Sequence, residues 1–600
     1  MTLKKTDYEI VGLLHEKIER LCLRLAPRQL FSQQPRLHFS PTVTDCDCGG
    51  DLRVLKTQHK ILSTLAIGQF EALETQRHCP RCGEIYRSEE LRALTPHRGQ
   101  FGFDVIEYIG RALFVHCRSE RSVQAELAAR NIPISSSEIG FLGKRFIVYL
   151  ALAQRACQDA LRAHMTAKGG YILHLDATCE GDSPQLFSCL DEISQIVLGN
   201  RKMPTEDSEH IIPLLRELKA AYGTPLALVH DRGRAILKAV ATVFPTVPDY
   251  ICHFHFLRDL GKDLFDFEYR TIRRYTKNLK AKAMLRGAGK ALREAIDNEP
   301  ALSENLQTYL ARKTANNDKP QVLTPWVSAY LLVAWVLEAD SGCEGFGFPF
   351  DRPHLMFYQR LREAYPALQK LSAKGVSVLP LSALRRVLTD AALQNLVRRI
   401  EQKINLFDRL REAMRIARPA CGQGLNDDGD GEIKTIESRV KAFRYSETVK
   451  ALSTTDVSYQ KMVKQIDKYW DKLFADPIAV NTPAGTVMIQ PQRTNNLMEQ
   501  SFRFLKRDGR KKTGQKALSR TLAAMLADTP LVRNLDNPDY MRILLDGKGT
   551  LAARFADIDI QQVREEEHAN NNRSRKYPKN MRRLFRVPNL PRKIMKVASM

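Results

Sequence analysis

Three short stretches of this 600-residue chain place acidic side chains where they could hold metal ions. Asp176 follows the apolar run Tyr171–Leu175, Asp231 follows the apolar run Pro225–His230, and Glu499 lies much farther along the chain. Carboxylates on rigid elements hold the two Mg²⁺ or Mn²⁺ ions, about 3.5–4 Å apart, that drive phosphodiester chemistry. Two capping aspartates and a surface salt bridge are the ordinary alternative for each acid taken singly. The three acids together, in this order, favour a two-metal phosphoryl-transfer site.

The sequence around the two aspartates predicts an α/β core. Both apolar runs are β-prone and indicate buried strands. Another strand is expected over Gln195–Leu198, and amphipathic helices over Ser208–Ala221 and from about Ala235 to Phe244. A short strand at Tyr250–Cys252 leads into a further helix. The pattern therefore places each aspartate at the end of a strand.

Helical spacing links Glu499 to a group of cations. Four basic residues follow it at i+4, i+7, i+8 and i+11, namely Arg503, Lys506, Arg507 and Arg510. On a helix these positions share one stripe. A metal ligand and phosphate-binding side chains would then lie on the same face, as a site acting on DNA requires.

These motifs resemble the DDE transposases of the ribonuclease-H-like superfamily, in particular Mutator-like elements and related bacterial insertion sequences. The matching residues are Asp176, Asp231, the Cys252-His253-Phe254-His255 segment, and the Asn495-Asn496-x-x-Glu499 stretch with its basic helix. The resemblance covers about residues 168–270 and 490–514. It implies a ribonuclease-H-like core in which Asp176, Asp231 and Glu499 bind the catalytic metals. It also implies cleavage at transposon ends, which releases a 3′-hydroxyl that attacks target DNA.

Cys252 and His255 support more than one interpretation. Two residues cannot complete a tetrahedral zinc site. A buried thiol and a hydrogen-bonded histidine that brace the chain near Asp231 are favoured, and contact of His255 with a substrate phosphate is the alternative.

Asp231 and Glu499 are 268 residues apart, which is too long for a loop. Most of the intervening sequence has apolar residues at helical spacing, so we expect a mostly α-helical insertion domain. The expected helices span Arg270–Asp297, Pro325–Glu338, Arg352–Lys374, Ala383–Ile416 and Ser446–Phe474.

Four cysteines form a second motif. Cys46-x-Cys48 and Cys79-x-x-Cys82 are two close pairs separated by strand-like sequence, which predicts a zinc ribbon with a structural Zn²⁺. His59 or His78 could replace one sulfur, and a redox dithiol is the competing interpretation.

A candidate helix-turn-helix follows the cysteine region. Ser122–Arg130 and Ser135–Tyr149 are the expected helices, and an ordinary helical hairpin is the alternative. The second helix offers Lys144 and Arg145 to DNA.

Composition agrees with a nucleic-acid partner, because 92 Lys and Arg against 68 Asp and Glu give a net charge of +24. The segment Arg573–Lys596 holds ten basic residues and no acid, which suits a phosphate-binding tail or a solubilising one. We expect double-stranded DNA as the partner, a homodimer or higher homo-oligomer, and a cytoplasmic, nucleoid-associated protein without membrane contact. Twelve cysteines without a disulfide-scaffold pattern fit a reducing compartment. Asn426–Glu437 has calcium-loop spacing, although an acidic linker is favoured there.

The predicted fold class is a multidomain α+β protein. It has an N-terminal zinc ribbon and helix-turn-helix, then a ribonuclease-H-like α/β catalytic core interrupted by a large α-helical insertion. The expected divisions are a helical segment over 1–45, the ribbon over 46–98, the helix-turn-helix region over 99–165, the core over 168–270 and 486–560, the insertion over 271–485, and a basic tail over 561–600. The expected activity is DNA cleavage and strand transfer. A transposase that has lost catalysis and only binds DNA is one alternative, and a nuclease that cleaves without joining is another.

Overall fold

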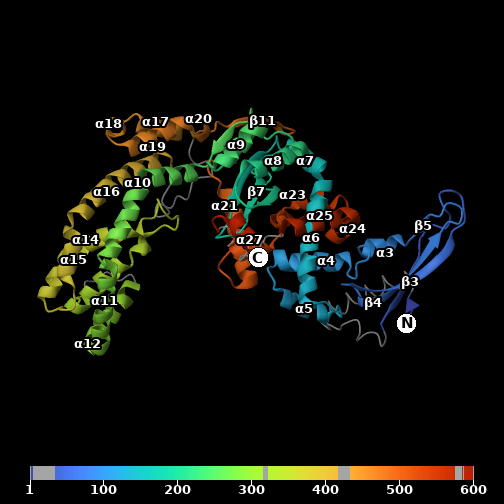
Figure 1. Ribbon diagram of the computed structural model, residues 1–600, viewed down its shortest axis with the longest axis horizontal. Helices are drawn as coiled ribbons and strands as arrows, with labels where there is room; N and C mark the ends of the chain where they lie inside the picture. The colour runs from blue at the N-terminus through green and yellow to red at the C-terminus, as the bar shows by residue number, and fades with distance from the viewer. Residues whose placement is uncertain are drawn as a thin grey trace.

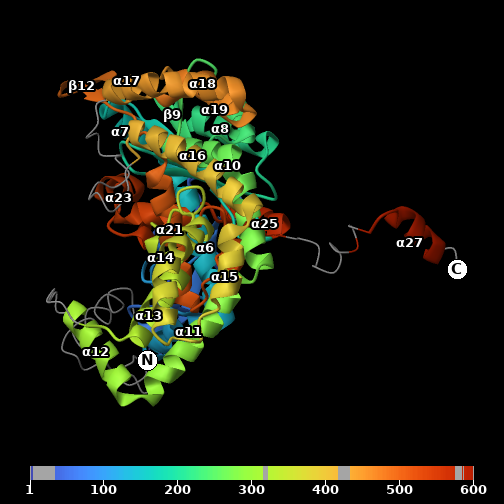
Figure 2. The same cartoon turned by 90° about the vertical axis from the view of Figure 1, so that its left-hand side faces the viewer.

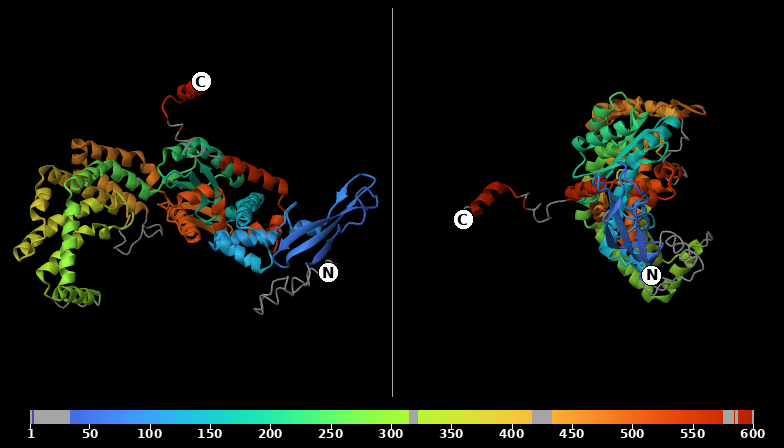
Figure 3. Two further views of the ribbon diagram at one scale, coloured as in Figure 1. Left: turned by 60° about the horizontal axis from the view of Figure 1, so that its bottom comes forward. Right: turned by 90° about the vertical axis from the view of Figure 1, so that its right-hand side faces the viewer.

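The computed structural model describes residues 2–3, 34–314, 322–416, 433–574, 584 and 587–598. The molecule is elongated, with a helical arm on one side, an α/β body in the middle and a long β-hairpin on the other side (Figure 1). Helix α27 (Leu590–Ala598) stands away from the body, as Figures 2 and 3 show. The mixed α/β class expected from the sequence is confirmed. Residues 426–432 of the expected acidic linker Asn426–Glu437 lie outside the described residues.

The body is built around a five-stranded mixed sheet with strand order β10-β9-β6-β7-β8. Its strands are β6 (Ile172–Thr178), β7 (Gln185–Asp191), β8 (Val197–Met203), β9 (Ala227–His230) and β10 (Asp249–Ile251). Strands β6, β7 and β8 form an antiparallel meander, and β9 and β10 continue the sheet parallel to β6. Helix α8 (Ser208–Tyr222) and helix α9 (Arg234–Val243) make the crossovers.

Most of these elements agree with the sequence-based expectations. Strand β6, however, runs to Thr178, so Asp176 lies inside the strand and not after it. Strand β7 was not predicted, although six of its seven residues are buried, because polar residues interrupt its apolar ones. Its pairing with β6 places Ser188 opposite Asp176.

The two faces of the sheet are covered by different parts of the chain. Leu173, Leu175 and Phe187 face the large core that the helices of the body share. On the other face, Ile172 and Val229 contact a hairpin formed by β11 (Ile478–Thr482) and β12 (Gly485–Ile489). Because β-strand side chains alternate, His174 and Asp176 share the face of Ile172. The site residues of β6 therefore lie on the same face as the hairpin.

The described residues of the N-terminal region form a sheet. Strand β2 (Arg36–Phe39) pairs with β1 (Thr2–Leu3) and with β4 (Gly68–His78), and its alternating Leu37 and Phe39 are buried in a small core that includes Phe70 and Leu91. Strand β3 (Arg53–Thr64) pairs with β4, and β5 (Ile85–Tyr86) adds an edge. Residues 4–33 of the expected segment lie outside the described residues.

The helix pair that was expected after the cysteine region is present. It consists of α5 (Glu120–Ala129) and α6 (Ser136–Ala156), and the Ser135 hydroxyl caps α6 by accepting from Glu138 N–H. Helix α6 is longer than predicted and lies in the middle of the body, where Leu142, Phe146 and Leu150 are buried. The pair is preceded in the chain by α3 (Glu89–Leu94), α4 (Phe103–Gly110) and η1 (Arg111–Val115), and it is followed by α7 (Gln158–Ala167).

The long stretch between β10 and the hairpin folds as the helical arm, as expected (Figures 1 and 2). Helix α10 begins at the sheet and runs the full way into the arm. Three predicted helices are interrupted: the first at Leu279–Lys280, the fourth at Asp390, and the last at Asp456 and Tyr469. Capping by Asp390 and Asp456 and a left-handed Lys280 explain these breaks, which apolar periodicity does not detect. The arm contains α10 (His253–Asn278), α11 (Ala281–Asn298), α12 (Pro300–Thr314), α13 (Pro325–Leu337), α14 (Pro353–Ala373), α15 (Leu381–Thr389), α16 (Ala391–Ala413), α17 (Ile433–Arg444), α18 (Glu447–Thr455), α19 (Val457–Lys468) and α20 (Trp470–Leu473).

The chain returns to the body with α21 (Asn496–Thr513) and the helices that follow it. These are α22 (Ser519–Ala524), η4 (Thr529–Asp536), α23 (Pro538–Leu545), α24 (Leu551–Ala556) and α25 (Ile560–Ser574). Helix α25 is joined to α6 by ion pairs of Arg145 with Glu567 and of Arg155 with Glu566. The expected tail over 561–600 is therefore part of the body as far as α25. Among the described residues, no helix has both the length and the apolar character needed to cross a bilayer.

Candidate functional site

Asp176 and Asp231 lie on neighbouring parallel strands. The register pairs Leu175 of β6 with His230 of β9, so the two aspartates occupy equivalent positions one residue farther along. Asp176 is almost fully buried, and Asp231 keeps about a fifth of its side chain exposed. The sheet itself thus brings the two carboxylates together at one edge, although 54 residues separate them in the chain.

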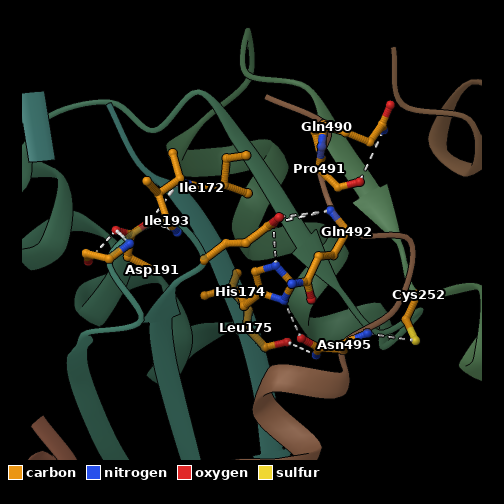
Figure 4. A network of polar contacts seen from close by, with 12 residues as sticks. Ile172, His174, Leu175, Asp191, Ile193, Cys252, Gln490, Pro491, Gln492 and Asn495 are labelled. Carbon is orange, nitrogen blue, oxygen red and sulfur yellow. Dashed lines mark hydrogen bonds and ion pairs between the residues drawn. The ribbon is translucent and has the colours of Figure 1, made fainter. Parts of the chain in front are cut away.

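Asn495 fastens the start of α21 to this edge of the sheet (Figure 4). Its side-chain Nδ2 donates to the Leu175 carbonyl at 2.9 Å, and its Oδ1 lies 2.9 Å from Nδ1 of His174. Its backbone N–H donates to the Cys252 sulfur at 3.2 Å. One buried residue therefore contacts β6 beside Asp176 and the end of β10. This arrangement directs the first turn of α21, with Glu499, toward the aspartates.

A second set of contacts extends this anchor. His174 Nε2 lies 2.9 Å from the Glu192 carboxylate, which also accepts from Gln492 N–H at 3.2 Å (Figure 4). His174 and Glu192 are fully or almost fully buried. The segment that leads into α21 is thus held at both Gln492 and Asn495. His174 and Glu192 were not singled out from the sequence, although His174 is two residues before Asp176 and so shares its face of β6.

His255 lies between two of the acids. Its Nδ1 is 2.5 Å from Asp231 Oδ1, and its Nε2 is 3.8 Å from Glu499 Oε1. Burial alone would lower the pKa of His255, but the neighbouring Cys252 sulfur and Asp231 carboxylate raise that pKa well above its usual value. The sulfur of Cys252, Nδ1 or Nε2 of His255 and a carboxylate oxygen of Asp231 lie within 4.8 Å of one another. The C-x-x-H segment therefore connects Asp231 to Glu499.

The charges of Asp231 and Glu499 both act on Asp176. Burial raises the pKa of Asp176 well above its usual value, and the Asp231 carboxylate raises it further. His255 opposes this effect, whereas Glu499 adds to it. Three carboxylates from β6, from the end of β9 and from α21 thus converge in a partly dry environment, where the other two act on Asp176.

Glu206 is a fourth acid that sequence reasoning missed. It lies in the loop between β8 and α8, and one of its oxygens would be 2.6 Å from a Cβ placed on Gly233. Burial raises the pKa of Glu206, and the nearby Asp231 carboxylate contributes to the increase. No motif in the sequence marks this position, because its proximity to Asp231 depends on how the β8–α8 loop packs on the Asp231–Gly233 turn.

The basic residues of α21 lie where helical spacing predicted. Arg503, Lys506, Arg507 and Arg510 are exposed, and Arg503 reaches Glu499 at 3.4 Å. On α6, Lys144 is exposed, whereas Arg145 is committed to both oxygens of Glu567 at 2.7 and 3.0 Å. The Asn496 side chain has no hydrogen-bond partner among the described residues, in contrast to the Asn495 side chain. The two asparagines of the motif thus differ in their contacts.

The four N-terminal cysteines form a compact cluster. Cys46 and Cys82 have their sulfurs 3.4 Å apart, those of Cys48 and Cys79 are 3.5 Å apart, and all four lie within 4.8 Å. Thiolates about 2.3 Å from a tetrahedral Zn²⁺ would be separated by roughly 3.8 Å. A hydrogen bond from the Tyr86 hydroxyl lowers the pKa of Cys46 to about 6, which favours the thiolate that binds metal. The cluster is compatible with zinc.

The two histidines considered as substitutes are not part of this cluster. His59 lies 2.8 Å from Glu71 on the adjacent strand, and His78 ends β4 outside the group of four sulfurs. Both knuckles have the tight turns that a metal site needs, since Gly49 N–H donates to Cys46 O and Gly83 N–H to Cys79 O. Both glycines have positive φ.

Comparisons with known proteins do not identify a relative. No family model matches the chain, and no curated protein matches it.

Proposed function

We propose that the protein is a DDE-type transposase of the ribonuclease-H-like superfamily. It cleaves DNA at transposon ends and joins the released 3′-hydroxyl to target DNA. The convergence of Asp176, Asp231 and Glu499 carries this proposal, because they come from three separate segments in the order that the sequence motifs require. The mixed sheet, with an antiparallel meander extended by two parallel strands, supports a ribonuclease-H-like core.

The donor set fits divalent cations that prefer oxygen. The Asp231 and Glu499 carboxylates raise the pKa of the buried Asp176, so a bound cation would relieve this repulsion. Oxygen ligands suit Mg²⁺ or Mn²⁺ better than softer ions. When bound, two such ions would activate the attacking oxygen and stabilise the leaving one. Asp176, Asp231 and Glu499 are the residues that would hold them.

The surrounding residues would fix this geometry. His255 orients the carboxylates of Asp231 and Glu499 by lying between them, and Asn495 fixes α21 against β6. Burial of Asp176 limits water at the edge of the sheet. Such preorganisation matters because a misplacement of about 1 Å can slow a reaction by on the order of a hundredfold.

The partner is double-stranded DNA. The exposed cations of α21 continue from Glu499 along the same helix, so they would neutralise phosphates adjacent to the scissile bond. The N-terminal ribbon, with zinc as a structural ion, and the α5–α6 pair would contribute to recognition of the transposon ends. A dimer of the chain would hold two ends together.

The proposal is tested with labelled DNA that carries the sequences flanking the coding region. The full-length, zinc-loaded protein is incubated with this DNA and a target plasmid, with and without Mg²⁺. We expect Mg²⁺-dependent cleavage at the ends and covalent joining to the target. Cleavage without joining would instead identify a nuclease, and binding without either reaction would identify a DNA-binding protein that has lost catalysis.

A further inference from the structure

A large cleft lies between α6 and the C-terminal half of α21. Its volume is about 970 Å³, at the upper end of the range of roughly 300–1,000 Å³ that ligand pockets occupy. Helix η1, the α22 region and η4 complete its walls. The apolar floor includes Leu113, Ile147 and Val532. This cleft is separate from the three carboxylates, none of which lines it.

Aromatic rings in the cleft are paired with cations. Phe504 has the guanidinium carbons of Arg507 and Arg533 at 4.5 and 5.0 Å from its ring centre. Phe114 is approached by Lys512 at 5.4 Å. Phe504 is 38% exposed, so one part of its ring remains open to a ligand. A flat aromatic surface beside positive charge suits a nucleobase attached to a phosphate.

Phe141 provides a second exposed ring on the opposite wall. It belongs to α6, is 41% exposed, and lines the cleft. Arg145 lies 4.7 Å from its ring centre. Rings from α6 and from α21 are therefore available on both sides of the same space.

The charge of the cleft is complementary to a phosphate backbone. Seven Lys and Arg side chains line it, against four Asp and Glu side chains. Lys144, Lys511 and Arg520 have no ion-pair partner among the residues that the structure describes. The Nη1 atom of Arg533 is buried and likewise lacks a hydrogen-bond partner there. A bound ligand could therefore neutralise three positive charges and accept a hydrogen bond from one buried donor.

Helix α21 connects the cleft to the carboxylates. Glu499 is in its first turn, and Arg507 is eight residues farther along, a distance of about 12 Å at 1.5 Å per residue. Nucleotides are spaced by about 3.4 Å along one strand of B-DNA, so three or four of them span this distance. A strand held at Glu499 can therefore reach the cleft.

We infer that the cleft binds unpaired nucleotides of the DNA strand whose backbone lies at Glu499. Phe504 and Phe141 stack on the bases, and Lys144, Lys511 and Arg520 neutralise the phosphates. This inference rests on the proposed function for its substrate class. It adds a binding site for single-stranded DNA next to the reaction centre.

Inside a duplex the base faces are covered by neighbouring base pairs, and they become accessible when a nucleotide is unpaired. In a duplex, proteins reach the phosphates and the base edges, whereas stacking on an aromatic ring requires a base outside the helix. The exposed rings and the apolar floor of this cleft would contribute little to the binding of a fully paired DNA end. Unpaired nucleotides are therefore the occupant that uses both its aromatic and its basic residues.

The test compares two DNA probes with the full-length, zinc-loaded protein in buffer without Mg²⁺. One probe is a blunt duplex, and the other is the same duplex with a short single-stranded extension that carries a fluorescent base analogue. We expect tighter binding of the extended probe and a change in emission as the analogue stacks. Phe504→Ala and Phe141→Ala should each weaken this preference by about fivefold to a hundredfold, because one base-aromatic stack contributes this much.

Two controls make the result specific. Phe267→Ala removes a ring of equal size that is 72% exposed on α10, and it should keep the preference. Phe504→Tyr retains a ring and should also keep it. Equal binding of the two probes by the wild-type protein, or an unchanged preference in both alanine variants, would overturn the inference. Because no cleavage is involved, loss of this preference and absence of catalysis are separate results.

Discussion

At the scale of single residues, the site depends on how three acids are held apart from solvent and close to one another. Asp176 is placed by β6, Asp231 by the end of β9, and Glu499 by α21. His255 lies between Asp231 and Glu499, which gives the C-x-x-H segment a position at the centre of the site. Asn495 is the residue that fixes the third acid to the strands of the first two.

Substitution of Asn495 tests this positioning role. Asn495→Ala leaves the Leu175 carbonyl and His174 without their buried partner, at a cost of about 2–4 kcal/mol in the free energy of unfolding. We expect cleavage slower by on the order of a hundredfold, with unchanged affinity for DNA. Thermal unfolding, single-turnover cleavage and a binding titration measure the three quantities.

The adjacent asparagine provides the matched control. Asn496→Ala should leave stability and cleavage nearly unchanged, since the side chain makes no hydrogen bond in the described part of the chain. Equal effects of the two substitutions would show that Asn495 does not position α21.

At the scale of elements, two units can be tested separately, namely the N-terminal hairpin with its cysteine cluster and the basic face of α21. The first would be a structural site, because a zinc ion held by four sulfurs has no open position for a substrate. The second is an extended surface that continues from the first turn of the helix, where Glu499 lies. Their loss should therefore produce different defects.

Removal of one cysteine should release the metal. Cys79→Ser replaces a fully buried sulfur of the cluster, so we expect zinc content to fall from one ion per chain to nearly none and the N-terminal sheet to lose stability. Metal analysis of the purified protein gives the result. Cys179→Ser, at an exposed position outside the cluster, should retain zinc. Full zinc content in Cys79→Ser would refute the four-sulfur site.

Neutral substitutions on α21 should change the salt dependence of DNA binding. Each phosphate contact contributes about 0.9 to the slope of log K against log salt, so Lys506→Gln with Arg510→Gln should make the slope shallower by about two. Affinity measured over a series of salt concentrations gives the slope. Lys290→Gln, at a 79% exposed position on α11, is the control and should leave it unchanged. The same slope in the double variant would remove α21 from the DNA interface.

At the scale of the whole molecule, the helical arm is inserted between two parts of one site. The arm leaves the sheet through α10, which starts directly after β10, and the chain returns beside that point, where His253 N–H donates to the Arg493 carbonyl. The two ends of the insertion are therefore adjacent. A long insertion at this point does not prevent Glu499 from lying near the two aspartates.

The arm contains a buried ion pair that couples its helices. Lys403 of α16 lies 2.8 Å from Glu268 of α10, and both are at most 5% exposed. Lys403→Met leaves a buried carboxylate with only the more distant Arg399, so we expect a loss of about 3 kcal/mol in unfolding free energy. Adding Glu268→Leu should restore much of it. Chemical denaturation of the single and double variants measures the coupling, and additive losses would exclude it.

Much of this architecture is predictable from sequence because periodicity and caps are local signals. Helix α8 and strand β9 follow from the pattern of apolar residues, and the basic stripe of α21 follows from the helical spacing of its cations. The contact of His174 with Asn495 and the electrostatic effect of Asp231 on Glu206 join residues that are distant in the chain, so no local pattern reveals them. Likewise, Arg145 has the positive charge that a DNA contact needs, but its guanidinium is bound to Glu567. Only the packing of α25 on α6 determines this ion pair.

The most direct test of the central claim is the rate of Mg²⁺-dependent cleavage of transposon-end DNA by the wild type and by Glu499→Gln, with DNA affinity measured in parallel. Glu447→Gln, at a 91% exposed position on α18, is the control. Loss of a metal ligand should raise the barrier by about 4 kcal/mol, which slows cleavage by roughly a thousandfold while affinity is retained. Cleavage by Glu499→Gln within a few fold of the wild-type rate would contradict the assignment of the three acids to one catalytic site.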